Sequence, residues 1–157
     1  MATGSQPFVS PWLVAAAGWA VPGLGHAIVG QKWRGVALFA AVASLFVGGL
    51  LIGGVRVVDM PGYFDGQRQI LRNGSWTLTQ NPVGTVLGKP WFIAQSLTGP
   101  SAFVAGYGGI VAARNGYPKP TARLSDIGVL YCATAGMMNL IGILDASGRA
   151  SRQGGKS

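Results

Sequence analysis

Four long stretches of this chain contain no charged residue. No Asp, Glu, Lys or Arg occurs in residues 8–29, 36–55, 90–113 or 127–144, which are 18 to 24 residues long. At about 1.5 Å of rise per residue, a helix of this length crosses a hydrocarbon core of roughly 30 Å. A soluble helical protein would instead carry charges along the wet face of each helix. The pattern therefore predicts a polytopic membrane protein.

The predicted fold is all-α, with four transmembrane helices arranged as two antiparallel hairpins in a single domain. The spans are expected at about 8–29, 36–55, 90–113 and 126–145, with an interfacial loop over 56–89 and a basic tail over 147–157. The short turn Gly30–Gly35 forces the first two spans into a hairpin. Pro22 predicts a kink in the first span, and Gly99-Pro100 predicts a kink or break in the third. Ser125-Asp126 is a suitable N-cap for the fourth.

Composition agrees with a membrane location. Charged residues make up 10% of the chain, against roughly 25% in an average soluble domain. The net charge of +8 does not indicate nucleic-acid binding, because the basic residues are scattered singly through the links. Anionic lipid headgroups account for them more simply. The single cysteine, Cys132, excludes an internal disulfide and a cysteine-based metal site.

Small residues recur at four-residue spacing within the apolar stretches, a pattern that lets two helix backbones approach closely in lipid. Asn139 lies well inside the fourth stretch, where the favoured interpretation is an interhelical hydrogen bond rather than a proton path. The residues expected to pack helices are Ser44, Gly48, Gly49, Gly53, Ala105, Gly109, Gly128, Cys132, Gly136 and Asn139.

Aromatic residues near the ends of the stretches are expected to anchor them at the membrane surface. These are Trp12, Trp33, Trp91 and Tyr117. Trp12 and Trp33 would lie about 31 Å apart on one helix, at opposite interfaces. Four spans would put both termini and the loop 56–89 on one side. The short links 30–35 and 114–124 would lie on the other, and their five basic residues favour the cytoplasmic side.

Two parts of the chain resemble known bacterial membrane proteins. The segment Trp19-Ala-Val-Pro-Gly-Leu-Gly-His26, followed by Gly30–Gly35 and an apolar stretch, is similar to the hairpin of the two-transmembrane-helix domain type. Residues 126–131, 135–140 and 144–146 resemble the last helix of an uncharacterised bacterial four-span family of unknown function. The resemblance implies a multi-pass protein of the bacterial inner membrane, and it brings no activity with it.

His26, the only histidine, offers one candidate cofactor ligand. A neutral imidazole in an apolar bundle could bind haem iron or chlorophyll magnesium. The alternative is a hydrogen bond to the carbonyl groups that Pro22 and the neighbouring glycines leave free. No catalytic dyad or triad can be assembled from the sequence, and no cofactor is required by it.

Three functions remain open at this point. The first is a non-enzymatic accessory subunit that packs through its Gly and Ala helix faces against other subunits of a larger membrane complex. The second is a small oligomeric channel or carrier, lined by the proline-interrupted first and third spans. The third is a haem- or chlorophyll-binding subunit of an electron-transfer or light-harvesting complex.

Overall fold

The computed structural model describes residues 9–58, 60, 89–118 and 121–154, and all regular structure in these residues is helical. The elements are α1 (Pro11–Ala20), α2 (Leu24–Ile28), α3 (Lys32–Gly53), the 3₁₀ helix η1 (Val55–Val57), α6 (Pro90–Ser96), α7 (Pro100–Arg114) and α8 (Ala122–Gly154). The all-α prediction is therefore confirmed for this part of the chain. Most of the predicted interfacial loop, residues 59 and 61–88, lies outside the described residues.

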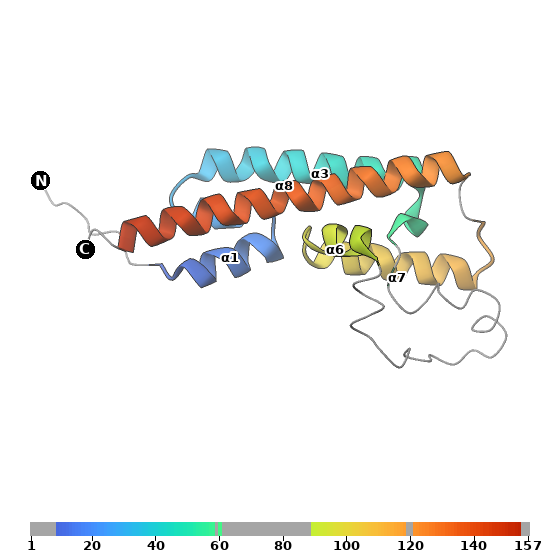
Figure 1. Cartoon of the computed structure of the whole chain (residues 1–157), viewed down its shortest axis with the longest axis horizontal. Coiled ribbons are helices and arrows are strands. Elements are labelled where there is room, and N and C mark those ends of the chain that lie inside the picture. Colours follow the sequence, from blue (N-terminus) through green and yellow to red (C-terminus); the bar gives the residue numbers. More distant parts are fainter. Residues whose placement is uncertain (1–8, 59, 61–88, 119–120, 155–157) are drawn as a thin grey trace, which may run out of the picture.

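Helices α3 and α8 lie side by side and antiparallel along the long axis of the molecule (Figure 1). Their 22 and 33 residues correspond to about 33 and 50 Å. Both are long and apolar enough to cross a membrane, and they are the two such helices in the described residues. The main core forms around this pair, and its buried members are Val42, Phe46, Val57, Val58, Phe92, Ala102, Cys132 and Ala135.

The first apolar stretch is not one helix but two that turn back on each other. Helix α1 ends at Ala20, and Pro22 and Gly23 separate it from α2. Gly23 adopts a φ of +83° and lies against the carbonyl of Gly35. Val29, after α2, packs against the buried cluster of Val14, Ala146 and Ala150. The chain therefore returns to the end of the bundle from which α1 started.

This reversal corrects two expectations. A single continuous helix over 8–29 does not form, because a proline without an N–H group and a glycine of positive φ allow the chain to reverse rather than merely kink. Trp12 at the start of α1 and Trp33 at the start of α3 consequently lie at the same end of the bundle, not at opposite ends.

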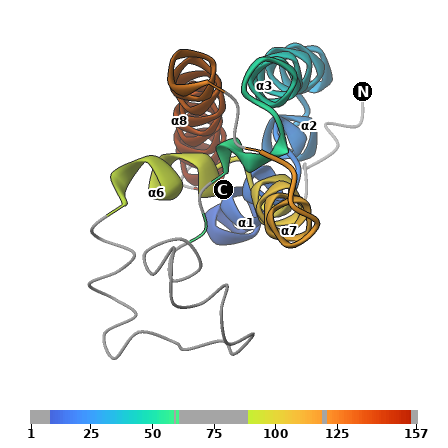
Figure 2. The ribbon, with the colours of Figure 1, turned by 90° about the vertical axis from the view of Figure 1, so that its right-hand side faces the viewer.

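The third apolar stretch is also broken, as Gly99-Pro100 predicts. Helix α6 ends at Ser96 and α7 begins at Pro100. The hydroxyl groups of Ser96 and Thr98 donate to the carbonyl oxygens of Ile93 and Gln95, each at 2.7 Å. Figure 2, a view along the bundle, shows α6 lying crosswise while α7 runs along the bundle axis.

The bundle has two ends, which we call the terminal end and the loop end. At the terminal end, α1 and α3 begin and α8 ends. At the loop end, α3 ends next to the start of α8, where Gly53 faces Gly128 and Leu124, and α7 ends beside Arg56. The link 30–35 therefore lies at the terminal end and the described residues that flank the link 114–124 lie at the loop end, whereas both links were expected at one end.

Helix α8 is longer at both ends than the fourth predicted span. It begins at Ala122, so Ser125 and Asp126 lie inside the helix and do not cap it. It continues through Gly154, so most of the expected basic tail is helical. Val14 of α1 packs on Ala146 and Ala150, which extends the apolar face of α8 beyond Asp145.

Candidate functional site

The two broken stretches meet near the middle of α8 at Asn139, whose side chain is fully buried. The Asn139 Nδ2 group donates to the carbonyl oxygen of Gly18 at 3.2 Å and to that of Leu97 at 2.8 Å. Gly18 belongs to α1, and Leu97 caps the end of α6. One side chain of the long helix therefore holds two pairs of helices, α1–α2 and α6–α7, which we call the two hairpins. We call this region the hairpin junction.

Direct contacts between the hairpins complete the junction. The Trp19 Nε1 group donates to the carbonyl oxygen of Ser96 at 3.1 Å. Gly99 adopts φ +83° and ψ −152° and lies against the carbonyl of Trp19, where a Cβ atom would overlap the oxygen. Gly136 of α8 likewise lies against the carbonyl of Ala94. Glycine is required at these places because backbone meets backbone.

Buried polar side chains gather on α6 and in the turn that follows it. Gln95 and Thr98 are each 1% exposed. Gln95 Nε2 donates to the carbonyl oxygen of Val57 at 3.3 Å. Within the described residues, Gln95 Oε1 and Asn139 Oδ1 are buried without a hydrogen-bond partner. An unsatisfied buried amide oxygen costs roughly 1–3 kcal/mol, so each of these two atoms could accept a hydrogen bond from a further donor.

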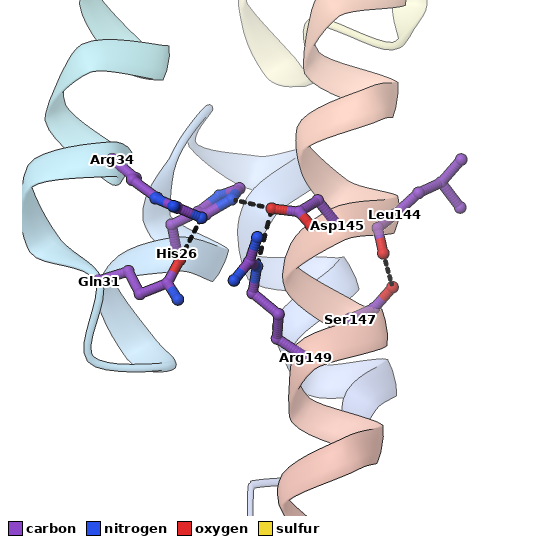
Figure 3. Close-up of polar contacts among 7 residues, drawn as sticks. All are labelled: His26, Gln31, Arg34, Leu144, Asp145, Ser147 and Arg149. Atoms are coloured by element: carbon purple, nitrogen blue, oxygen red, sulfur yellow. Dashed lines mark hydrogen bonds and ion pairs between the residues drawn. The ribbon is translucent and has the colours of Figure 1, made fainter.

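A second polar cluster lies at the terminal end (Figure 3). His26 of α2 is buried, and its Nε2 atom lies 3.1 Å from Asp145 Oδ2 on α8. Arg149, one turn further along α8, donates through Nε to the same oxygen at 2.9 Å. Arg34 donates to Gln31 Oε1 at 3.5 Å on the α3 side of His26. The carboxylate of Asp145 therefore joins α2 to the last third of α8.

In the part of the chain that the structure describes, His26 pairs with Asp145 rather than with a hydroxyl group. Ser147, the nearest hydroxyl drawn in Figure 3, bonds to the carbonyl oxygen of Leu144 and does not approach His26. Across the described residues, no three His, Cys, Asp or Glu side chains group closely enough to hold a metal ion. What the arrangement can do is fix the buried imidazole and fasten the α1–α2 hairpin to α8.

Most of the expected packing residues serve contacts inside this chain. Gly49, Gly53, Gly128 and Cys132 form the seam between α3 and α8, where a Cβ atom on Gly49 would lie 2.7 Å from the Cys132 sulfur. Gly109 lies against the carbonyl of Val55, Gly136 against that of Ala94, and Ala105 against the main core. Ser44 and Gly48 differ, because Ser44 is exposed and a Cβ atom on Gly48 would meet, among the described residues, only Tyr131 at 4.0 Å.

The four aromatic residues expected as anchors are all exposed: Trp12, Trp33, Trp91 and Tyr117. Their location at a membrane surface stays a prediction. At the loop end, Tyr117 lines a cavity of about 280 Å³ together with Gly54, Val55, Arg56, Ala112 and Pro118. Arg56 Nη1 donates to the Tyr117 carbonyl oxygen at 2.8 Å and so ties η1 to the segment after α7.

A family model described as a family of unknown function, DUF6677, matches residues 13–157. The chain belongs to the DUF6677 family. No curated protein and no solved structure matches it. The match confirms the resemblance to a family of unknown function, whereas bacterial origin and four-span topology stay predictions.

Sequence reasoning singled out some of the residues that matter in this DUF6677 chain and missed others. It named His26 and Asn139, but it did not place His26 beside Asp145, because 119 residues separate them in the chain. It did not single out Gln95, although a glutamine inside an uncharged apolar stretch is a visible signal. Trp19 was part of a family motif, and its contact with the second hairpin could not be inferred from that.

Proposed function

We propose that this DUF6677 protein is a multi-pass protein of the bacterial inner membrane in which α3 and α8 span the bilayer. Support comes from the outward faces of the long helices, which present large apolar side chains. On α3 these are Val36, Phe39, Val47 and Leu51, on α7 Phe103, Val104, Tyr107 and Val111, and on α8 Leu124, Ile127, Leu130, Tyr131, Met137, Ile141 and Leu144. A surface of this kind suits lipid. Basic residues at both ends suit anionic headgroups.

In the proposed topology the two hairpins are re-entrant. The α1–α2 hairpin enters from the terminal end and returns to it, and α6–α7 reaches the junction from the loop end. The segment between η1 and α6 then lies across the membrane from both termini. Four complete spans would instead place that segment and the termini on one side. The two topologies therefore differ in the side of the membrane on which the segment lies relative to the termini, and this can be measured.

We further propose a non-enzymatic role as an accessory subunit of a larger membrane complex, with α3 as the contact helix. The observation that carries this proposal is the contrast between Gly48 and Gly49. Gly49 is closed in by α8, whereas Gly48 and Ser44 leave a shallow small-residue face open on the outside of α3. Ala40 is exposed on the same side, and its carbonyl oxygen accepts the Ser44 hydroxyl at 2.7 Å. Such a face suits close approach of a helix from another subunit.

Site-specific crosslinking in native membranes tests this role. In a Cys132→Ala background, a cysteine at position 44 is expected to crosslink to an unlike membrane subunit. A cysteine at Val104, which is 73% exposed on α7, serves as the lipid-facing control and should give no such product. A position-44 crosslink to a second copy alone, or no crosslink at all, contradicts the accessory role.

A small channel or carrier is the second candidate, and the hairpin junction favours it. Interrupted helices that meet inside a bundle, with buried amide side chains between them, are the usual setting of solute sites in transporters. Ion or solute flux in proteoliposomes that contain the purified chain alone would support this candidate. Flux that is equal in empty liposomes would remove it.

Haem or chlorophyll binding is the candidate that the geometry supports least. The Nε2 atom of His26 is engaged with Asp145, and the side chain is 7% exposed between α2 and α8. An axial ligand needs a nitrogen that faces the macrocycle, so His26 is better explained as a structural residue. Visible absorption bands that disappear on His26→Ala would reverse this assignment.

A further inference from the structure

The terminal end of the bundle carries more positive than negative charge. Its described residues, which fall within 9–40 and 140–154, include the basic side chains of Lys32, Arg34, Arg149 and Arg152 and the acidic side chain of Asp145. Helix α3 begins and α8 ends here, so the antiparallel pair brings the basic residues of both helices together. A surface with such an excess of positive charge attracts anionic ligands.

Arg34 and Arg149 lie at nearly the same level along the bundle axis. Gly142 of α8 packs against the Leu38 side chain of α3, which fixes the register of the two helices. Toward the terminal end, Arg34 lies about 6 Å from the level of Leu38, and Arg149 lies about 10 Å from the level of Gly142. The two arginines therefore differ in level by about one helical turn at most.

Both arginine side chains extend from their helices into the space between α3 and α8, beside His26 (Figure 3). Asp145 Oδ2 holds the Arg149 guanidinium group through Nε at 2.9 Å, and the two Nη groups have no partner within the described residues. Arg34 is exposed, and its 3.5 Å contact with Gln31 is long for a hydrogen bond. Both guanidinium groups therefore retain N–H donors for a ligand.

Two tryptophans at the same end indicate what surrounds the arginines. Trp12 is 84% exposed at the start of α1, and Trp33, next to Arg34, is 80% exposed. Exposed Trp side chains of membrane proteins concentrate at the level of the lipid headgroups. On the proposed membrane location, the arginines therefore lie in the headgroup layer, where the anion at hand is a phospholipid.

We propose that Arg34 and Arg149 together bind the phosphate group of an anionic phospholipid. A guanidinium group can donate two parallel hydrogen bonds to phosphate oxygens. Two such groups from different helices hold one headgroup beside the α3–α8 pair, and basic residues between transmembrane helices are a usual setting for anionic headgroups. The inference rests on the proposed membrane location and does not depend on the accessory role of α3.

Native mass spectrometry of the full chain, released from detergent micelles, tests the proposal. The micelles contain either phosphatidylglycerol, which is anionic, or phosphatidylcholine, which is zwitterionic, at equal mole fraction. Each arginine near an anionic lipid strengthens binding about fivefold. The first phosphatidylglycerol should therefore bind roughly 25-fold more tightly than the first phosphatidylcholine. Equal apparent Kd values for the two lipids would overturn the proposal.

A soluble competitor separates a lipid from a free phosphate compound. Glycerol phosphate in large molar excess should not displace phosphatidylglycerol, because it lacks the acyl chains that keep the lipid beside the helices. Displacement would assign the site to a soluble phosphate instead. Sedimentation with membranes checks the membrane location separately. A chain that is integral to the membrane but prefers neither lipid overturns this inference and leaves the proposed function standing.

Charge-matched variants locate the binding site. Arg34→Gln should weaken the first phosphatidylglycerol about fivefold, and Arg34→Gln combined with Arg149→Gln should weaken it roughly 25-fold. Arg123→Gln removes the same charge from an exposed position at the loop end of α8 and should leave the Kd unchanged. Equal losses in Arg34→Gln and Arg123→Gln, or no loss in Arg34→Gln, would overturn the assignment. If the double variant does not fold, the exposed Arg34 alone decides the result.

Discussion

Replacing Gly99 with alanine is the sharpest test of the hairpin junction. Gly99 combines φ +83° with ψ −152°, a conformation that residues with a Cβ atom rarely adopt, and forcing one into it costs roughly 1–3 kcal/mol. The added methyl group would also overlap the carbonyl oxygen of Trp19. Moving α1 away to relieve the overlap would break the hydrogen bond from Trp19 to Ser96, which contributes about 1 kcal/mol.

Together these effects predict a loss of about 3 kcal/mol in the free energy of unfolding for Gly99→Ala. For a chain of this length, that corresponds to a Tm lower by about 10 °C. The assay is thermal unfolding in detergent, followed by far-ultraviolet circular dichroism. Gly108→Ala is the matched control inside the helix that Gly99 caps, because its Cβ atom would meet no atom of the described residues within 4 Å. Alanine there should stabilise the protein by up to about 1 kcal/mol.

The two substitutions must therefore shift the Tm in opposite directions. If Gly99→Ala unfolds within about 1 °C of the unmodified protein, the two hairpins do not meet backbone to backbone, and the reasoning fails. If Gly108→Ala is as damaging as Gly99→Ala, the assay reports any change in α7 rather than the junction.

Three further predictions concern other parts of the fold. Gly49→Ala should lower the Tm because its Cβ atom would press on Cys132, whereas Gly48→Ala should not lower it; equal effects would contradict the seam. Asp145→Asn should cost at most about 1 kcal/mol, since the carboxylate is 44% exposed, and a larger loss would mean that the His26 contact matters more than its exposure suggests. Cysteines at positions 75 and 151, in a Cys132→Ala background, should react with an impermeant maleimide from opposite sides of the membrane. Labelling from one side would favour four complete spans.

The sequence predicted where helices form better than it predicted how consecutive helices are arranged in space. The uncharged stretches, the break at Gly99-Pro100 and the small-residue seam around Gly49 can all be inferred from local patterns. The reversal at Pro22-Gly23 cannot, because a kinked span and a re-entrant hairpin have the same composition and the same proline. The choice depends on contacts between distant segments, such as Gly23 with Gly35 and Gly18 with Asn139.

The candidate sites were likewise predictable only where they depend on local residues and not on contacts between distant segments. A buried Asn139 is visible in the sequence as an amide inside an apolar stretch, and its contact with carbonyl groups is the natural expectation. Which carbonyl groups it contacts depends on where α1 and α6 stop, and helix ends are set by tertiary contacts as much as by local residues. His26 and Asp145 were both visible, but nothing in their spacing indicated that they would meet.

The contacts of the first hairpin have a consequence for how the protein is made. Gly18 and His26 are fastened to Asn139 and Asp145, which lie 121 and 119 positions later in the chain. During synthesis the amino-terminal segment emerges long before its binding surface on α8 exists. On the proposed membrane location, truncated products that stop before α8 should therefore present an undocked hairpin to the membrane insertion machinery and to proteases. Loss of the carboxyl-terminal helix should therefore act first on nascent chains, through quality control, rather than at a later step.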